Sequence, residues 1–142
     1  MGHIGDILKK KGADVWSISP DATVFEALQL MADKEIGAVV VIEGGRPIGI
    51  MSERDYARKV ILRDRASHST PVREIMSPRP VCIRPGQSCE EAMALMSARR
   101  IRHLPVIEDG ALVGIISIGD LVQAKIADQK FMIQQLESYI TG

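Results

Sequence analysis

The chain has 142 residues, of which 46% are hydrophobic, 25% charged and 4% aromatic, and its 18 basic side chains balance 18 acidic ones. This composition fits a globular protein made of one domain or of two small ones that share a core, because a half of roughly 60 residues buries too little surface to be stable alone. Zero net charge removes the long-range field that usually draws nucleic acids and acidic membranes to a protein, so neither is an expected partner.

No segment of the sequence predicts a membrane span, a secretory signal or a metal site. The longest apolar run, residues 38–42, is far shorter than the ~18 residues that a membrane-spanning helix needs, and we expect a cytoplasmic protein. Cys82 and Cys89 lack the spacing of a metal or redox motif, and the three histidines are scattered. We therefore expect ordinary reduced thiols and no bound metal.

The sequence contains an internal repeat. Residues 20–56 align with residues 85–121 without a gap, and 14 of these 37 aligned positions are identical. Such agreement at a fixed offset indicates a tandem duplication in which each copy is one structural unit.

In chain order, the pattern of each copy predicts a strand, a helix, a β-hairpin and a second helix. Thr23 to Glu26 and Ser88 to Glu91 have the form of capping boxes, which open helices. β-Branched runs joined by glycine turns predict the hairpins. The predicted strands are 15–18, 38–42 and 47–51 in the first copy, and 81–83, 104–107 and 112–116 in the second.

The remaining segments are a connector and a long helix. Residues 63–71 are polar and end in proline, which predicts a linker. From Asp120 onward, apolar residues at helical spacing predict a long amphipathic helix whose apolar stripe needs a partner, and self-association is a natural use for it. The predicted stripe contains Leu121, Ile126, Ile133, Leu136 and Ile140. We divide the chain into a first repeat (1–62), a linker (63–71), a second repeat (72–127) and a C-terminal helical extension (128–142).

Both copies end in glycine, two apolar residues and Ser-x-x-Asp, at residues 49–55 and 114–120. With the strand-helix-hairpin-helix pattern and the segment Ile-Arg-His-Leu-Pro-Val at 101–106, the chain resembles a tandem CBS-domain protein, of the stand-alone bacterial type. The family is named after cystathionine β-synthase. The resemblance implies an α/β (α+β) fold in which two repeats with small sheets and flanking helices pack about a pseudo-two-fold axis.

The resemblance also implies a function. CBS pairs are regulatory modules, usually not enzymes, that bind adenosine-containing ligands such as AMP, ADP, ATP, NAD or S-adenosylmethionine in clefts between the repeats. Two pairs usually assemble into a homodimer, and the ligand state is passed to a protein target, here unknown. The motif aspartate accepts hydrogen bonds from the ribose hydroxyls, and the serine contacts ribose or phosphate.

Carried over, the resemblance predicts two unequal clefts. The favoured nucleotide site contains Ser52, Arg54, Asp55, Val81, Ile83, Ile101, Arg102 and His103. The second, weaker cleft contains Trp16, Ile18, Ile36, Gly37, Ala38, Ser117, Gly119 and Asp120. The first is favoured because its arginines and histidine could bind phosphate, whereas Gly37, Ala38 and Gly119 replace the cationic positions in the second.

The chemistry of the Ser-x-x-Asp motif is compatible with ribose binding, and also with the simpler role of a helix cap. A carboxylate in the first turn of a helix can accept two hydrogen bonds from a cis-diol, beside free backbone N–H groups that favour anions. Ser-x-x-Asp is equally a helix-capping pattern. Trp16 could stack on an adenine or anchor the core. We assign Lys9 to Lys11 to a solvated loop and the basic run Arg99 to Arg102 to a solvated helix end. For Arg102, as for Arg54, this solvated surface charge is the alternative to phosphate binding.

The leading hypothesis is therefore a module that senses energy or metabolite state by a conformational shift. The alternative is a scaffolding or nucleic-acid-binding module without small-molecule sensing. An enzyme is not expected, because the sequence has no nucleophile elbow, P-loop or paired histidines.

Overall fold

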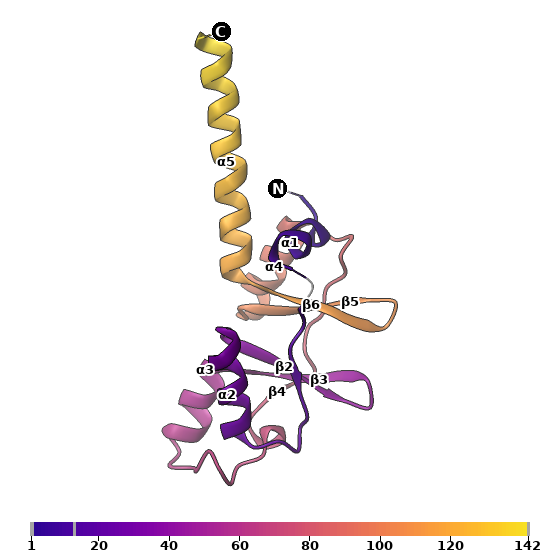
Figure 1. Cartoon of the computed structure of the whole chain (residues 1–142), viewed down its shortest axis with the longest axis vertical. Helices are drawn as coiled ribbons and strands as arrows, with labels where there is room; N and C mark the ends of the chain where they lie inside the picture. Colours follow the sequence, from indigo (N-terminus) through magenta and orange to yellow (C-terminus); the bar gives the residue numbers. More distant parts are fainter. Residues whose placement is uncertain (1, 13, 142) are drawn as a thin grey trace. The chain divides into compact units, whose positions relative to one another are not determined.

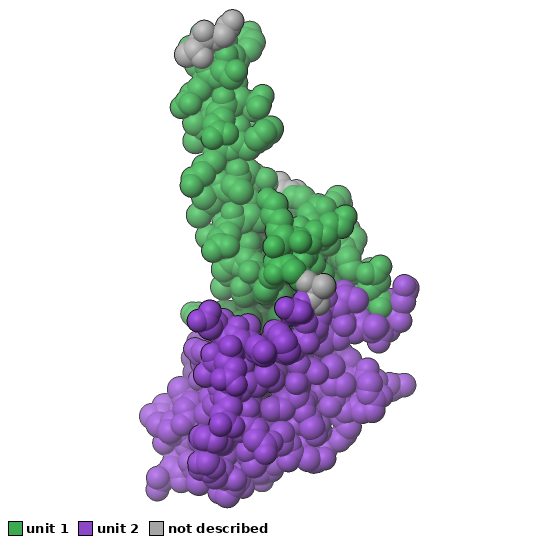
Figure 2. Space-filling view, in the orientation of Figure 1, with its two compact units in different colours: residues 1–13, 82–108, 114–142 green, residues 14–81, 109–113 purple. Residues whose placement is uncertain are grey.

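The computed structural model describes residues 2–12 and 14–141 (Figure 1), and the chain divides into two compact units, which are coloured separately in Figure 2. Unit 1 comprises residues 1–13, 82–108 and 114–142, and unit 2 comprises residues 14–81 and 109–113. Each unit therefore combines segments that the sequence repeat assigns to different copies.

Unit 2 contains a four-stranded sheet in the order β1-β2-β3-β4, with β1 parallel to β2 and the other neighbours antiparallel. Its elements are β1 (Ser17–Ile18), α2 (Val24–Lys34), β2 (Ala38–Glu43), β3 (Arg46–Ser52), α3 (Glu53–Tyr56), the π-helix η1 (Ala57–Ile61), the 3-10 helix η2 (Val72–Glu74) and β4 (Ser77–Pro78). Gly44 and Gly45 form the β2-β3 turn with φ of 59° and 78°, a backbone conformation that glycine adopts without steric cost.

The core of unit 2 lies between α2 and the sheet. Val24, Ala27 and Met31 of α2 pack with buried residues of β2 and β3. The predicted linker lies against the start of α2, because the backbone N–H of Val24 donates to the carbonyl oxygen of Thr70 at 2.8 Å. Thr70 is itself only 3% exposed, so this polar connector is part of the packed unit.

Unit 1 is built from helices and one hairpin. Its elements are α1 (Ile4–Lys11), α4 (Cys89–Arg99), β5 (His103–Glu108), residues 114–117 of β6 (Ala111–Ser117) and α5 (Ile118–Thr141). Strands β5 and β6 form a two-stranded sheet, and Ile83 adds an isolated parallel bridge to Val106. The segment before α1 is held to α4, where the N–H of Cys89 donates to the carbonyl oxygen of Gly2 at 3.1 Å.

Equivalent glycines show how each hairpin packs in its unit. A Cβ on Gly114 of β6 would lie 2.5 Å from Cδ2 of Leu8 in α1, and a Cβ on Gly49 of β3 would lie 2.6 Å from Sδ of Met76. The N-terminal segment thus packs on the hairpin of the second repeat, while the segment after the linker packs on the hairpin of the first.

The structure confirms the predicted fold class, the order of elements in the first repeat and the Thr23 capping box. In the second repeat, the predicted strand at 81–83 is reduced to an isolated bridge from Ile83 to Val106, and the helix, hairpin and second helix follow as predicted. Three other local predictions are wrong. Lys9 to Lys11 form the last turn of α1 instead of a loop. Only half of the second capping box forms: Ser88 accepts from the N–H of Glu91, whose carboxylate accepts from Gln87 instead of returning to the backbone.

The third wrong prediction concerns the stripe of the long helix. Leu121 is fully buried, whereas Ile126, Ile133, Leu136 and Ile140 are all exposed. Leu121 therefore belongs to the face of α5 that packs in unit 1. Among the described residues, no helix combines the length and apolar character needed to cross a membrane.

Candidate functional site

Asp55 lies in the first turn of α3, where β3 ends. Its carboxylate oxygen Oδ2 accepts from the backbone N–H of Ser52 at 2.9 Å, and its own N–H donates to Oγ of Ser52 at 3.2 Å. This is a complete capping box, so the simpler role predicted for Ser-x-x-Asp is present. The motif serine is held at the strand end because Ser52 pairs with Ala38 of β2.

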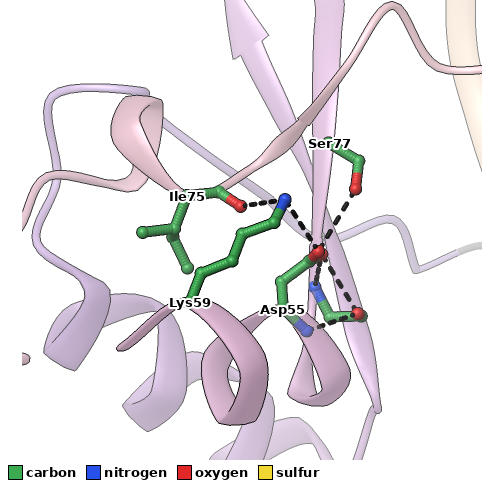
Figure 3. A network of polar contacts seen from close by, with 5 residues as sticks. Asp55, Lys59, Ile75 and Ser77 are labelled. Atoms are coloured by element: carbon green, nitrogen blue, oxygen red, sulfur yellow. Dashed lines mark hydrogen bonds and ion pairs between the residues drawn. The ribbon is translucent and has the colours of Figure 1, made fainter. Parts of the chain in front are cut away.

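Two further side chains contact the other oxygen of Asp55 (Figure 3). Oδ1 lies 3.3 Å from Nζ of Lys59, one helical turn later, and accepts from Oγ of Ser77 at 3.2 Å. Lys59 also donates to the carbonyl oxygen of Ile75 at 3.0 Å. Both carboxylate oxygens of Asp55 are therefore engaged within unit 2, and its side chain is 13% exposed.

Asp120 occupies the equivalent place in α5 with a different set of partners. Oδ2 accepts from the N–H of Ser117 and from Nζ of Lys11, both at 2.8 Å, and Lys11 also donates to the carbonyl oxygen of Ile115 at 2.9 Å. Within the described part of the chain, Oδ1 has no hydrogen-bond or ion-pair partner. One oxygen of this carboxylate is thus left to bind another group.

The surroundings of Asp120 favour its ionised form. Burial acts to raise the pKa of this carboxyl group, but hydrogen bonds from Lys11 and Ser117 and the charge of Lys11 outweigh it, and the pKa lies below its ordinary value. An ionised carboxylate accepts hydrogen bonds without donating any, which suits it to hydroxyl groups of a ligand.

Each motif aspartate has a lysine ammonium group as a partner, but the two lysines do not occupy equivalent positions in the two repeats. Lys59 follows Asp55 on the same helical segment, while Lys11 reaches Asp120 from α1. In the second repeat, Ala124 stands at the position of Lys59. Because alanine is short, it leaves space beside Asp120.

A pocket of about 420 Å³ lies at this place, wholly within unit 1. It is lined by Gly2, His3, Asp6, Ile7, Lys10, Lys11, Cys89, Asp120, Gln123, Ala124, Ala127 and Asp128. Three carboxylates, two ammonium groups and a histidine make its lining mixed in charge. Burial raises the pKa of the Cys89 thiol, which keeps this pocket residue a neutral thiol. Among the described residues, no group of His, Cys, Asp and Glu side chains is arranged to hold a metal ion.

The other residues predicted for the favoured site are distributed over both units. In unit 2, Arg54 is exposed on α3 and Val81 is half-buried. In unit 1, Ile101 and His103 are half-buried, whereas Ile83 is only 1% exposed and offers little side-chain surface to a ligand.

The start of the second strand lies beside the start of the following helix in both units. The carbonyl oxygen of Arg102 accepts from the N–H of Ile118 at 2.9 Å, and that of Gly37 accepts from the N–H of Glu53 at 3.1 Å. The structure thus brings Arg102 to the Ser-x-x-Asp turn of its own repeat. Its side chain is exposed.

The second predicted set is placed as follows. Trp16 is half-buried, and Nζ of Lys34 lies 4.2 Å from the centroid of its ring, which is a cation–π contact within unit 2. Ile18, Ile36 and Gly37 are half-buried, and Ala38 is 2% exposed. Ser117, Gly119 and Asp120 belong to unit 1.

Three polar residues that contact the aspartates, Lys11, Lys59 and Ser77, are absent from the two predicted sites. Lys59 could have been found, because an ion pair between positions i and i+4 is expected on a helix. Lys11 and Ser77 could not, because Lys11 is 109 residues from Asp120 and Ser77 is 22 from Asp55. No local pattern links residues at such separations.

Comparison with known proteins agrees with the fold. The model of the CBS domain family matches residues 4–62 and 72–127. The CBS domain-containing protein CBSX3, mitochondrial, of Arabidopsis thaliana is 40% identical over 98% of this chain and 72% of its own length. The structure of a protein with CBS domains from Burkholderia ambifaria MC40-6 has 47% identity and a TM-score of 0.85, and the match covers 89% of this chain and 96% of that one.

A more distant structure carries ligands. It is a CBS domain pair in complex with 5-methylthioadenosine and S-adenosyl-L-methionine, with 20% identity, a TM-score of 0.79 and coverage of 89% of this chain and 97% of that one. At this level of identity it establishes a common fold.

Proposed function

The chain belongs to the CBS-domain family, and from this premise we propose that it is a non-catalytic regulatory module that binds an adenosine-containing ligand. AMP, ADP, ATP, NAD and S-adenosylmethionine are the candidate ligands. The observation that carries the proposal is the ionised carboxylate of Asp120, which has one engaged oxygen and one oxygen left to accept from a ribose hydroxyl.

We propose that the predicted site residues form two ligand-binding sets, one around each motif aspartate. Ser52, Arg54 and Asp55 would act with Val81, Ile83 and residues 101–103, and Ser117, Gly119 and Asp120 would act with Trp16, Ile18 and residues 36–38. Because Ile83 and Ala38 are almost fully buried, we assign them a role in packing behind a ligand. In each set the aspartate would bind the ribose.

The contacts of the two aspartates support the opposite order of affinity from the sequence. A ligand at Asp55 has to displace Ser77 or Lys59 from Oδ1, whereas none of the described residues occupies Oδ1 of Asp120 in this way. Breaking these contacts subtracts from the binding free energy. We therefore propose Asp120 as the tighter ribose site, with Lys11 holding its carboxylate in the ionised form.

The proposed mechanism is a population shift. A ligand that binds one conformation of the module better than another increases the share of that conformation. Self-association into a homodimer would present the same surfaces twice to a protein target. A cytoplasmic location remains a prediction.

Calorimetric titration of the five candidate ligands into the wild-type chain tests this proposal. Asp120→Ala should weaken the tightest binding by about 10-fold to 100-fold, because charge-assisted hydrogen bonds contribute roughly 1.5–3 kcal/mol. Asp55→Ala should leave that site intact. Asp33→Ala, at an exposed position of α2, is the matched control for loss of one carboxylate.

Both aspartates also cap helices, so each variant needs a folding control. Circular dichroism and thermal unfolding should show a native fold with stability lowered by about 1 kcal/mol. If no candidate ligand binds the wild type at millimolar concentration, the sensing function is refuted. If a ligand binds but Asp55→Ala weakens it more than Asp120→Ala, the proposed order of the two sites is wrong.

A further inference from the structure

Helix α5 has two faces of different character. Asp120, Ala124 and Asp128 are partly buried and Leu121 is fully buried, and these residues lie on the face that packs in unit 1. An apolar stripe lies on the opposite face and is 36% to 80% exposed at every member: Ile118, Val122, Ile126, Ile133, Leu136 and Ile140. A solvent-facing helix surface is normally polar, so this stripe indicates a surface that another element covers.

The second half of α5 lies beyond the other helices of unit 1 (Figure 1). Every residue from 129 to 140 is exposed, including the large apolar side chains of Phe131, Met132 and Tyr139. Because this segment continues α5 without a break, its helical conformation needs no partner, but its exposed apolar side chains favour one. The match to the CBS domain ends at residue 127, so this segment lies outside the repeats.

The stripe follows the seven-residue spacing of a coiled coil. Ile126, Ile133 and Ile140 are seven residues apart and occupy position a, and position d is occupied by Val122, Gln129 and Leu136. Lys130 and Glu137 occupy position e, beside the seam. Such a pattern buries its a and d residues against another helix of the same kind.

We propose that residues 129–140 of α5 pair with the same segment of a second copy of this chain, in antiparallel orientation. The charges beside the seam select this orientation. A parallel pair would place Lys125 at position g beside the partner's Lys130, which is repulsive. An antiparallel pair centred between Ile133 and Leu136 places Lys130 beside the partner's Glu137, and by symmetry this ion pair forms twice.

The antiparallel arrangement also brings apolar side chains of the two copies together. Ile133 packs against the partner's Leu136, and Met132 at position g lies beside the partner's Tyr139. Each contact again occurs twice. Because only about three helical turns overlap, this interface is small and we expect a dissociation constant in the micromolar range.

Sedimentation equilibrium of the full chain tests whether residues 129–140 of α5 form the dimer interface. Ile133→Glu should weaken the dimer by at least about 100-fold, because two buried isoleucines are lost and two charges are placed in the seam. Phe131→Glu is the matched control, because Phe131 is similarly exposed (61% against 54%) but lies on the other side of the helix. It should leave the dimer unchanged. Both positions are exposed, so circular dichroism should show a folded chain in each variant.

Charge reversal tests the orientation. Lys130→Glu and Glu137→Lys should each weaken the antiparallel dimer about 3-fold to 10-fold, and the double variant should restore it, because the two ion pairs re-form with exchanged signs. In a parallel dimer, Lys130→Glu would instead strengthen association through the partner's Lys125.

The outcomes separate this inference from the proposed function. It deepens the proposed self-association and does not depend on ligand binding. A monomeric wild type refutes both the self-association and this interface, while the ligand titration still decides the sensing function. A dimer that is insensitive to Ile133→Glu, or equally sensitive to Phe131→Glu, refutes the interface alone. A dimer that the double charge reversal does not restore refutes the antiparallel arrangement.

Discussion

Replacing Lys11 by methionine removes the ammonium group beside Asp120 and keeps the apolar part of the side chain. The variant loses the contacts of Nζ to Asp120 at 2.8 Å and to the carbonyl oxygen of Ile115 at 2.9 Å. The side chains of Lys11 and Asp120 are 36% and 20% exposed, so solvent screens this ion pair and it should contribute at most about 1 kcal/mol. With the lost hydrogen bond to Ile115, we expect the free energy of unfolding to fall by about 1–2 kcal/mol at pH 7.

The effect should depend on pH with a definite sign. The pKa of Asp120 is lower in the folded chain than its ordinary value of 3.8. A carboxyl group of this kind adds stability above its unfolded pKa, and that stability is lost as the pH falls through the folded pKa. Without Lys11 the pKa of Asp120 in the folded chain should rise. As the pH falls, the variant should therefore lose the stability that the ionised Asp120 still contributes at a higher pH than the wild type does.

Urea unfolding at pH 7 measures the free energy of unfolding, and an NMR titration of the Asp120 carboxyl carbon measures the pKa of this group. Lys9→Met is the matched control, because Lys9 is exposed on the same helix turn and does not line the pocket. It should change neither the stability nor the pKa of Asp120. If Lys11→Met also leaves the pKa of Asp120 unchanged, the ion pair does not set the ionisation of this carboxylate and the reasoning is refuted.

Further substitutions test the packing of the two units by thermal and urea unfolding. Gly49→Ala should cost about 1–3 kcal/mol, because its Cβ would lie 2.9 Å from the backbone oxygen of Ser77. Gly114→Ala should cost less, because the closest atoms belong to a flexible leucine side chain; equal costs would contradict this reading. Leu121→Ala should cost about 2–5 kcal/mol by opening a cavity, whereas Val122→Ala, one position later on the exposed face, should stay within about 0.5 kcal/mol. A larger effect at Val122 would show that the two faces of α5 are wrongly assigned.

Local patterns predicted the elements well where a short stretch of chain controls the geometry. Thr23 and Ser52 open helices because their hydroxyl groups accept from backbone N–H groups three residues later. Helix α1 was missed because its short segment lies outside the aligned repeat and its apolar residues contact partners that are distant in sequence. The orientation of α5 was missed at Leu121 because a helix with apolar residues on two faces does not reveal which face its own unit covers.

The sequence by itself determined the duplication, the strand-helix-hairpin-helix order, the Ser-x-x-Asp turns and the family. Each of these depends on residues close together in the chain or on repetition at a fixed offset. Only the tertiary structure decided that the N-terminal helix packs on the hairpin of the second repeat, and therefore that Lys11 meets Asp120 across 109 positions while Ser77 meets Asp55. These pairings arise because each hairpin buries its surface under a segment from elsewhere in the chain, and such long-range packing leaves no periodic signal in the sequence.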